Sequence, residues 1–343
     1  MTREPVELAA AAPAKVNLVL RVGPRRADGY HQVATLLVPL DLGDEVRVRV
    51  SPGRRGAVRC RVPGRPDLDG PGNLAARAAE AFQLRFGVRD RIAIRIAKRI
   101  PVTAGLGGGS SDAAAVLRCL ARAYRIRDRE ALAAVALAIG SDVPFFLGRG
   151  AAWAEGRGER LTPVRVPALH LLLAYPGDAR LAIRAGEAYG WLDELRGRRA
   201  TSRAHAASIG FRGASGHVRH RGRRGRHRGA KGTARLVREL AARLHNDLEA
   251  PCLDRRPPLE ELRRAVVGAG ALSAIMSGSG PTVFGVFASR GAAERAATVL
   301  RGAGGPGLEV HVARTRQRLP GVAPWRSPRS ASSRWTRRSS RPT

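Results

Sequence analysis

A glycine-rich run from Pro101 to Asp112 has the composition of a phosphate-binding loop. It follows an alternating apolar run, Ile92 to Lys98, that predicts a half-buried strand, and it precedes a helical pattern from Ala113 to Tyr124. A strand, a glycine loop and a helix start gather free backbone N–H groups around an anion. Glycine omits the Cβ atom that would hold a phosphate away. The run therefore predicts a phosphate site rather than a plain turn with an N-cap.

The loop lacks the Gly-Lys-Ser/Thr ending of a Walker loop, so a lysine must come from elsewhere in the chain. Lysine is scarce, because Lys15, Lys98 and Lys231 are the only lysines among 61 basic residues. A compact ammonium and a guanidinium fork are not equivalent beside a phosphate. Lys98 is either close to a nucleotide or a solvated lysine at a strand end. The residues assigned to the nucleotide loop are Pro101, Val102, Thr103, Ala104, Gly105, Leu106, Gly107, Gly108, Gly109, Ser110 and Ser111.

The elements that must position these residues show no regular βαβ alternation and no fixed-period repeat. Asn73 and Asp128 are expected to cap helices that run to about Phe86 and Ile139. We therefore expect an α+β fold with mixed or antiparallel sheets and a domain boundary near 161–167. The strands are expected over 16–22, 33–40, 45–50, 92–98, 151–155, 169–175, 272–276, 282–287 and 308–313, and the later helices over 183–196, 236–244, 259–267 and 292–300.

Composition separates a globular body from two arginine-rich segments. A length of 343 residues suggests two domains, and a hydrophobic share of 44% is ordinary for a globular protein. Of the net charge of +33, residues 198–231 and 326–343 supply 17 with no acidic residue. Segment 198–232 and tail 320–343 lack apolar periodicity, so both are expected to be disordered. They are either solvated insertions, the product of a shifted reading frame, or arms that contact RNA or lipid.

Cysteine number and hydropathy indicate the compartment. Three widely spaced cysteines argue against a disulfide framework and for a reducing environment. The longest apolar run, 131–139, is too short to span a bilayer, and the N-terminus lacks a signal pattern. We therefore expect a cytoplasmic protein with no membrane partner.

Six motifs together resemble those of the 4-diphosphocytidyl-2-C-methyl-D-erythritol kinases, a family of the GHMP superfamily of small-molecule kinases. The glycine loop alone would indicate only the superfamily, and the first two motifs of the set narrow the resemblance to the family. The resemblance runs from about Val6 to Arg316 and fails over 198–232. The motifs are Ala12-Pro-Ala-Lys-Val-Asn-Leu18, Arg26-Ala-Asp-Gly-Tyr-His31, Pro101 to Asp112, Gly140-Ser-Asp-Val-Pro-Phe-Phe146, His245-Asn-Asp-Leu-Glu249 and Ser277-Gly-Ser-Gly-Pro281.

The resemblance implies two domains with the active site between them. Residues 1–165 would form the N-terminal domain with the ATP loop, and residues 166–319 a ferredoxin-like C-terminal domain that contains the atypical insertion. A basic tail, 320–343, would follow. The implied reaction is the ATP-dependent phosphorylation, with Mg²⁺, of the 2-hydroxyl of the methylerythritol unit. The product would feed the non-mevalonate route to isoprenoid precursors. A monomer and a homodimer are both compatible with the sequence, which assigns no Mg²⁺ ligand.

Carried over residue by residue, the resemblance implies that Lys15 and Asp142 form the catalytic pair. Phosphoryl transfer needs a carboxylate for the attacking hydroxyl and a cation for the γ-phosphate, which agrees with these residue types. Asp142 could instead be an ordinary turn residue at a helix end. The implied substrate-binding residues are Asn17, Tyr30, His31, Gly278 and Ser279, with the cytosine near Tyr30 and His31.

Two motifs and two functions stay open on sequence alone. Residues 277–281 form either a second backbone nest for phosphate or a tight strand connection. The motif at 245–247 is either a helix C-terminal cap, which is the expectation, or part of a functional site. The alternative functions are a GHMP kinase for another small alcohol, such as homoserine or mevalonate, and an RNA-binding protein that uses the arginine-rich segments. Aromatic residues are only 4% of the chain, which disfavours RNA binding by the body.

Overall fold

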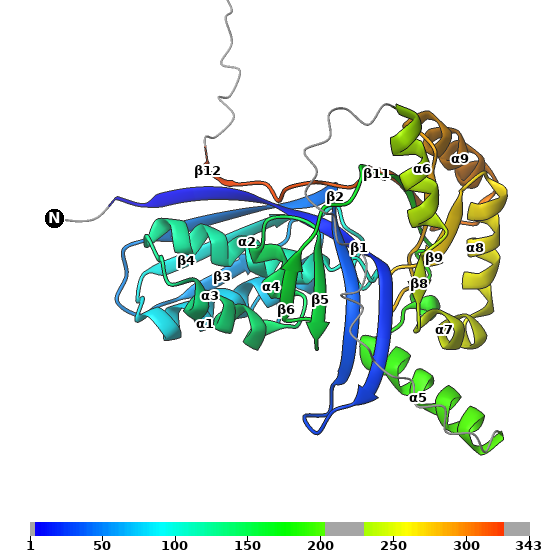
Figure 1. The fold of residues 1–343 in the computed structure, drawn as a ribbon. Coiled ribbons are helices and arrows are strands. Elements are labelled where there is room, and N and C mark those ends of the chain that lie inside the picture. Colours follow the sequence, from blue (N-terminus) through cyan, green and yellow to red (C-terminus); the bar gives the residue numbers. More distant parts are fainter. Residues whose placement is uncertain (1–3, 203–229, 326–343) are drawn as a thin grey trace, which may run out of the picture.

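Two β-sheets with helices packed against them make up residues 4–202 and 230–325, the part of the chain that the computed structural model describes (Figure 1). The first sheet has the order β12-β1-β2-β4-β3, with β5 and β6 extending from β2 and with β8 paired to β1. Its pairs are antiparallel except β1–β8 and β3–β4. The strands are β1 (Val6–Arg25), β2 (His31–Ser51), β3 (Val58–Arg61), β4 (Arg91–Ala97), β5 (Ala152–Gly156), β6 (Arg160–Pro163), β8 (His245–Asn246) and β12 (Val322–Pro324).

Four helices cover one face of this sheet and enclose its core, which includes the fully buried Phe82, Phe145 and Phe146 (Figure 1). Period-two apolar residues on β4 point to this core, because its burial alternates strictly. The side chains of Asn73 and Asp128 accept N–H groups of the first helical turns, which confirms both predicted caps. The helices are α1 (Leu74–Phe86), α2 (Gly108–Ala123), α3 (Arg129–Ile139) and α4 (Val143–Leu147).

The second sheet is antiparallel, with the order β11-β7-β10-β9. One face packs on α8 and α9, and its other face joins buried residues of β1 and β2 in a common core. Helices α5 and α7 pack against the far ends of β1 and β2. The elements are β7 (His170–Tyr175), α5 (Ala185–Ser202), α6 (Ala230–Ala241), α7 (Glu249–Arg255), α8 (Pro257–Gly268), β9 (Ser273–Met276), β10 (Val283–Phe287), α9 (Arg290–Ala303) and β11 (Glu309–Arg314).

The α+β prediction with antiparallel and mixed sheets is confirmed, but two local predictions are wrong. The two runs expected at 33–40 and 45–50 belong to one strand, β2, because β1 pairs along nearly its whole length. The helix after the glycine loop begins at Gly108 rather than Ala113. The helix predicted to run to about Ile139 does end there, and Pro144 lies in the first turn of the next helix, α4, where its missing N–H costs nothing.

The prediction that the tail 320–343 is disordered is wrong for its first residues. Val322–Pro324 form β12 and pair antiparallel with β1, and the guanidinium of Arg47 lies 3.4 Å from the Trp325 ring centroid. This cation–π contact and the strand hydrogen bonds hold a segment whose composition favours disorder. The ends of segment 198–232 continue α5 and begin α6. Residues 203–229 and 326–343, to which the rest of both disorder predictions applies, lie outside the described residues. Within the described ranges, no helix is both long and apolar enough to cross a bilayer.

Candidate functional site

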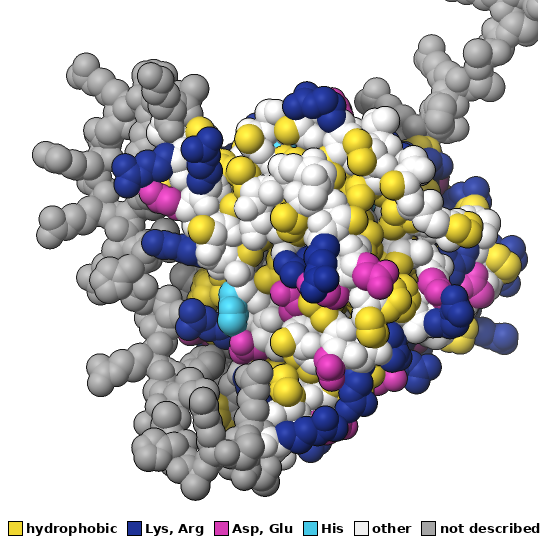
Figure 2. Space-filling model, turned by 90° about the vertical axis from the view of Figure 1, so that its right-hand side faces the viewer, with side chains coloured by type: hydrophobic (Ala, Val, Ile, Leu, Met, Phe, Trp, Pro, Cys, Tyr) yellow, Lys and Arg dark blue, Asp and Glu magenta, His cyan; other side chains and the backbone are white. Residues whose placement is uncertain are grey.

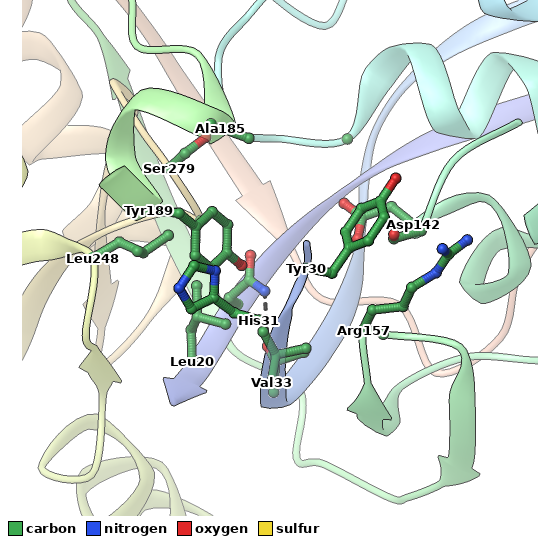
Figure 3. Close-up of a pocket in the computed structure, with 18 of the residues that line it drawn as sticks. Leu20, Tyr30, His31, Val33, Asp142, Arg157, Ala185, Tyr189, Leu248 and Ser279 are labelled. Carbon is green, nitrogen blue, oxygen red and sulfur yellow. Dashed lines mark hydrogen bonds between the residues drawn. The ribbon is translucent and has the colours of Figure 1, made fainter. Parts of the chain in front are cut away.

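Two cavities lie on either side of the glycine loop. The first, of about 600 Å³, is lined by residues of β1, β2, α5 and both glycine loops, with Lys15 and Asp142 among them (Figure 3). The second, of about 560 Å³, is lined by Pro101, Val102, Thr103 and residues of the second sheet's domain. Gly105, Gly107 and Ser110 face the first cavity. The loop therefore separates a space for one ligand from a space for another.

Lys15 lies at a bulge in β1. The register with β2 shifts between Pro13 and Lys15, and a bulge re-aims the side chain that follows it. The Lys15 N–H donates to the carbonyl of Leu106, and its Nζ donates to Asn17 Oδ1 at 2.7 Å and to Gly105 O at 3.2 Å. Its side chain is only 6% exposed. The ammonium is thus fixed against the glycine loop and is not a solvated strand-edge lysine.

Asp142 stands at the N-cap position of α4, but its side chain makes no capping hydrogen bond. Its Oδ2 lies 3.5 Å from Lys15 Nζ, and 38% of the side chain is exposed to the first cavity. A turn aspartate with a purely local role would accept backbone N–H groups, as Asp128 does on α3. The carboxylate is instead held beside an ammonium and is open to a ligand.

The glycine loop forms an anion cradle at the start of α2. Gly107 is the N-cap, with φ +70°, so the loop enters the helix through a left-handed residue that favours glycine. A Cβ at Gly107 would lie 3.0 Å from Lys15 Cγ, and one at Gly108 3.3 Å from Lys98 Nζ. Ser111 Oγ is buried and has no hydrogen-bond partner among the described residues. Free N–H groups at a helix start are suited to bind the phosphates of a nucleotide. An unpaired hydroxyl oxygen is the kind of ligand that Mg²⁺ takes.

The members of the predicted loop divide by position. Pro101, Val102 and Thr103 line the second cavity. Ala104 and Leu106 point into the core that the two sheets share. Gly108, Gly109, Ser110 and Ser111 form the first turn of α2.

The second glycine loop contacts the first directly. Ser277 Oγ donates to Gly105 O at 3.1 Å, and a Cβ at Gly278 would lie 3.3 Å from Lys15 Nζ. Asn246 Nδ2 donates to Met276 O and Gly278 O, at 2.9 and 2.8 Å. The predicted helix cap at 245–247 is therefore wrong, because His245 and Asn246 form β8 and Asn246 holds the second loop. Ser279 lines the first cavity.

The remaining predicted substrate residues also line the first cavity. Asn17 Nδ2 donates to Thr35 Oγ1 at 2.8 Å, which fixes its amide. His31 stacks on Tyr189 of α5, with ring centroids 5.0 Å apart, and Figure 3 shows the two rings overlapping. Tyr30 lies on the opposite side of the cavity and is 49% exposed (Figure 3). The Cζ atom of Arg157 stacks over its ring, 4.6 Å from the ring centroid. Two aromatic rings therefore flank the space.

Lys98 is neither solvated nor pointed at a free anion. Its Nζ contacts Asp44 Oδ2 at 2.5 Å and Asp112 Oδ2 at 2.9 Å. Asp44 Oδ1 also accepts the N–H groups of Arg99 and Ile100, just before the loop. Burial raises the pKa of Asp112 to about 8, against the lowering effect of Lys98. Burial lowers the pKa of Lys98, but the two carboxylates outweigh it and leave that pKa raised. The three side chains form a buried cluster with one excess acid.

The cluster predicts different effects for its two acids. Asp44→Asn is expected to lower the free energy of unfolding by roughly 1–3 kcal/mol, because a carboxylate that accepts the Arg99 and Ile100 N–H groups is lost and Asp112 must give up its proton to pair with Lys98. Asp112→Asn is expected to change it by only about 1 kcal/mol at pH 7, since a raised pKa leaves Asp112 mostly protonated. A native pKa above the unfolded value means that the folded chain binds more protons between about pH 4 and 8. Wild-type stability should therefore fall with rising pH across that window relative to Asp112→Asn, as measured by urea unfolding. Parallel pH profiles for the two proteins would contradict the assignment.

Sequence reasoning missed Thr35, Tyr189 and Asp193. Thr35 carries a hydroxyl in an apolar strand pattern, and its Oγ1 donates to Val19 O. Tyr189 and Asp193 are four residues apart on the predicted helix 183–196, so they share a face. That spacing is the signal by which both could have been found. Within the described ranges, no group of three or more His, Cys, Asp or Glu side chains could hold a metal ion.

Comparison with known proteins agrees with this geometry. Residues 73–150 match the GHMP kinases N terminal domain, and residues 229–305 match the GHMP kinases C terminal family. A 4-diphosphocytidyl-2-C-methyl-D-erythritol kinase of Anaeromyxobacter dehalogenans strain 2CP-1 is 63% identical over 341 residues, which cover 98% of this chain and 100% of the relative. That alignment spans the internal arginine-rich segment.

Two solved structures agree with the fold. A crystal structure of 4-(cytidine 5'-diphospho)-2C-methyl-D-erythritol kinase is 33% identical, with a TM-score of 0.65 over 90% of this chain and 98% of the other. A homoserine kinase from Cytophaga hutchinsonii has a TM-score of 0.62 at 18% identity and covers 94% and 97% of the two chains. At that identity the second similarity supports only the fold.

Proposed function

Since the chain belongs to the family of 4-diphosphocytidyl-2-C-methyl-D-erythritol kinases within the GHMP kinases, we propose that it phosphorylates the 2-hydroxyl of 4-diphosphocytidyl-2-C-methyl-D-erythritol with ATP. The observation that carries the mechanism is the approach of Lys15 Nζ to Asp142 Oδ2, at 3.5 Å, beside the glycine loop. The product enters the non-mevalonate route to isoprenoid precursors.

ATP is assigned to the glycine loop and the second cavity. The N–H groups at the start of α2 and the Ser110 and Ser111 hydroxyls would bind its phosphates. The cavity beside Pro101, Val102 and Thr103 would hold the nucleoside. Mg²⁺, when bound with ATP, neutralises phosphate charge, and it needs few protein ligands because phosphates and water supply the others. We assign Ser111 Oγ, which is buried without a partner among the described residues, as a protein ligand of this Mg²⁺.

Transfer is assigned to the two residues that meet at the loop. Asp142 would orient the attacking hydroxyl and accept its proton. Lys15 would offset the charge that develops on the transferred phosphoryl group, and its bonds to Asn17 and Gly105 hold the ammonium in place before reaction. Since phosphoryl transfer depends mainly on positioning and charge, no covalent intermediate on the protein is required.

The cytidine diphosphate substrate is assigned to the first cavity. Its base would lie between the Tyr30 and Tyr189 sides of the cavity, within reach of His31. Asn17, Gly278 and Ser279 would contact the part of the substrate near Lys15. A site that stacks and hydrogen-bonds a pyrimidine favours this substrate over homoserine or mevalonate, which have no base.

The charge distribution on one face of the body disfavours nucleic-acid binding there. On the face shown in Figure 2, basic side chains are dispersed among acidic and apolar ones instead of forming one basic patch. Several described arginines pair with acids, as Arg263 and Arg264 do with Glu260. A phosphate-tracking surface would show unpaired basic residues in a stripe.

Two wider assignments accompany the function. Cys60, Cys119 and Cys252 are free and buried, which supports a reducing, cytoplasmic environment. The chain passes from the first sheet to the second between β6 and β7, which supports a domain boundary near residue 165. The short strands β8 and β12 return to the first sheet from the C-terminal part.

A substrate panel tests the assignment. Purified full-length protein with ATP and Mg²⁺ should give a kcat/KM for the diphosphocytidyl substrate at least about 100-fold above those for homoserine and mevalonate. The preference follows from base contacts that the smaller alcohols cannot make. ADP release, measured for each alcohol and for ATP alone, gives the comparison. A higher kcat/KM for an alcohol that lacks cytidine would overturn the proposal.

A further inference from the structure

His31 is held across the first cavity by a residue of another element. His31 begins β2, whereas Asp193 and Tyr189 lie on α5. Its Nε2 lies 2.9 and 3.1 Å from the two carboxylate oxygens of Asp193, and its ring stacks on Tyr189 at an interplanar angle of 18°. The imidazole therefore has both its plane and one of its nitrogens fixed by α5.

The identity of the partner determines where the ring proton lies. An ionised carboxylate only accepts hydrogen bonds, so the nitrogen that faces Asp193 must carry the hydrogen. In a neutral imidazole the other nitrogen, Nδ1, is then an acceptor. Nδ1 has no hydrogen-bond partner among the described residues. It is also not one of the unpaired side-chain atoms that are fully buried from solvent. A free acceptor is thus presented where His31 lines the cavity.

We propose that Asp193 is a positioning residue that selects cytidine over uridine by fixing His31 in the Nε2–H tautomer. This rests on the proposed function, in which the substrate's base binds beside His31. Cytosine carries an exocyclic amine, which donates to an acceptor, where uracil carries a carbonyl oxygen, which does not. An Nδ1 acceptor therefore bonds cytosine and leaves two acceptors facing each other with uracil. A site built to bond one group rejects the analogue that lacks it.

The kinetic test compares the diphosphocytidyl substrate with its uridine counterpart. In wild type, kcat/KM should favour cytidine, and in Asp193→Ala that preference should fall by roughly tenfold or more, since a directed hydrogen bond is lost. The change should appear in KM for the cytidine substrate, while KM for ATP stays constant. Asp193→Glu, which restores a carboxylate, should recover part of the preference. Glu194→Gln is the matched control, because Glu194 is the next residue on α5 and contacts Arg255 and Arg198 instead of His31. It should leave the preference unchanged.

A second measurement does not depend on turnover. Two-bond ¹H–¹⁵N correlation spectra of ¹⁵N-histidine-labelled protein, assigned with His31→Gln, should show His31 as the Nε2–H tautomer in wild type and as a tautomer mixture in Asp193→Ala. An Nδ1–H tautomer or an imidazolium in wild type at neutral pH overturns the proposal. An unchanged cytidine preference in a folded, active Asp193→Ala protein also overturns it. If wild type fails to phosphorylate the cytidine substrate at all, the proposed function fails, and the spectra still decide the role of Asp193 toward His31.

Discussion

Asp142→Ala should lower kcat by about 10²- to 10⁴-fold with little change in KM for ATP or in the unfolding midpoint, because general-base assistance contributes about that factor. The carboxylate makes no capping bond to α4, so its removal breaks no backbone contact. Its pairing with Lys15 is 3.5 Å long and partly exposed, so the pair adds little to stability. Steady-state kinetics and urea unfolding of the same preparation provide both measurements.

Asp128 offers a matched control, because it holds the same N-cap position on α3 and does cap it, accepting from Ala131 N at 2.8 Å. Asp128→Ala should lower stability by about 1 kcal/mol and leave kcat at the wild-type value. If instead Asp142→Ala loses stability and keeps its turnover, Asp142 is a structural turn residue and the mechanism is wrong.

Gly105→Ala is expected to lose most activity and roughly 2–5 kcal/mol of stability, from a left-handed backbone plus overpacking. Gly105 has φ +72°, and an added Cβ would lie 2.3 Å from Ser277 O and 2.8 Å from Gly280 O. Those atoms belong to the second loop's backbone, which Asn246 holds in place, so they cannot move aside without a large cost in free energy. The two loops would be forced apart where Lys15 Nζ meets Gly105 O.

Gly87→Ala separates the two contributions. Gly87 ends α1 with φ +66°, but an added Cβ there would meet no atom within 4 Å. This variant should lose only about 1–2 kcal/mol, from the backbone alone, and keep full kcat. Equal stability losses and normal activity in both variants would mean that the contact between the loops is unimportant.

Local signals in the sequence predicted the parts of the fold that depend on neighbouring residues. Asn73 and Asp128 were predictable as caps because a side-chain oxygen before a helical pattern satisfies the first N–H groups. The strict alternation of apolar residues at 92–98 predicted β4, because successive side chains of a strand point to opposite faces of the sheet.

Distant contacts were beyond local reasoning. The burial of Lys98 depends on Asp44 and Asp112, which are brought to it from β2 and α2 by packing. The strand β12 forms because β1 offers an open edge and Arg47 stacks on Trp325, and neither appears in the tail's composition. Tyr189 and Asp193 face His31 only once α5 packs beside β2. In the candidate site, the family motifs supplied the residues, and the geometry added their partners.

A double-mutant cycle on kcat for Lys15→Met and Asp142→Ala tests most directly whether these two residues act on one phosphoryl group. Residues that act as a unit give strongly non-additive effects. The double variant should therefore be no slower than the slower single variant, within a few-fold. A double variant whose loss equals the product of the two single losses would mean that Lys15 and Asp142 act independently, and it would contradict the account.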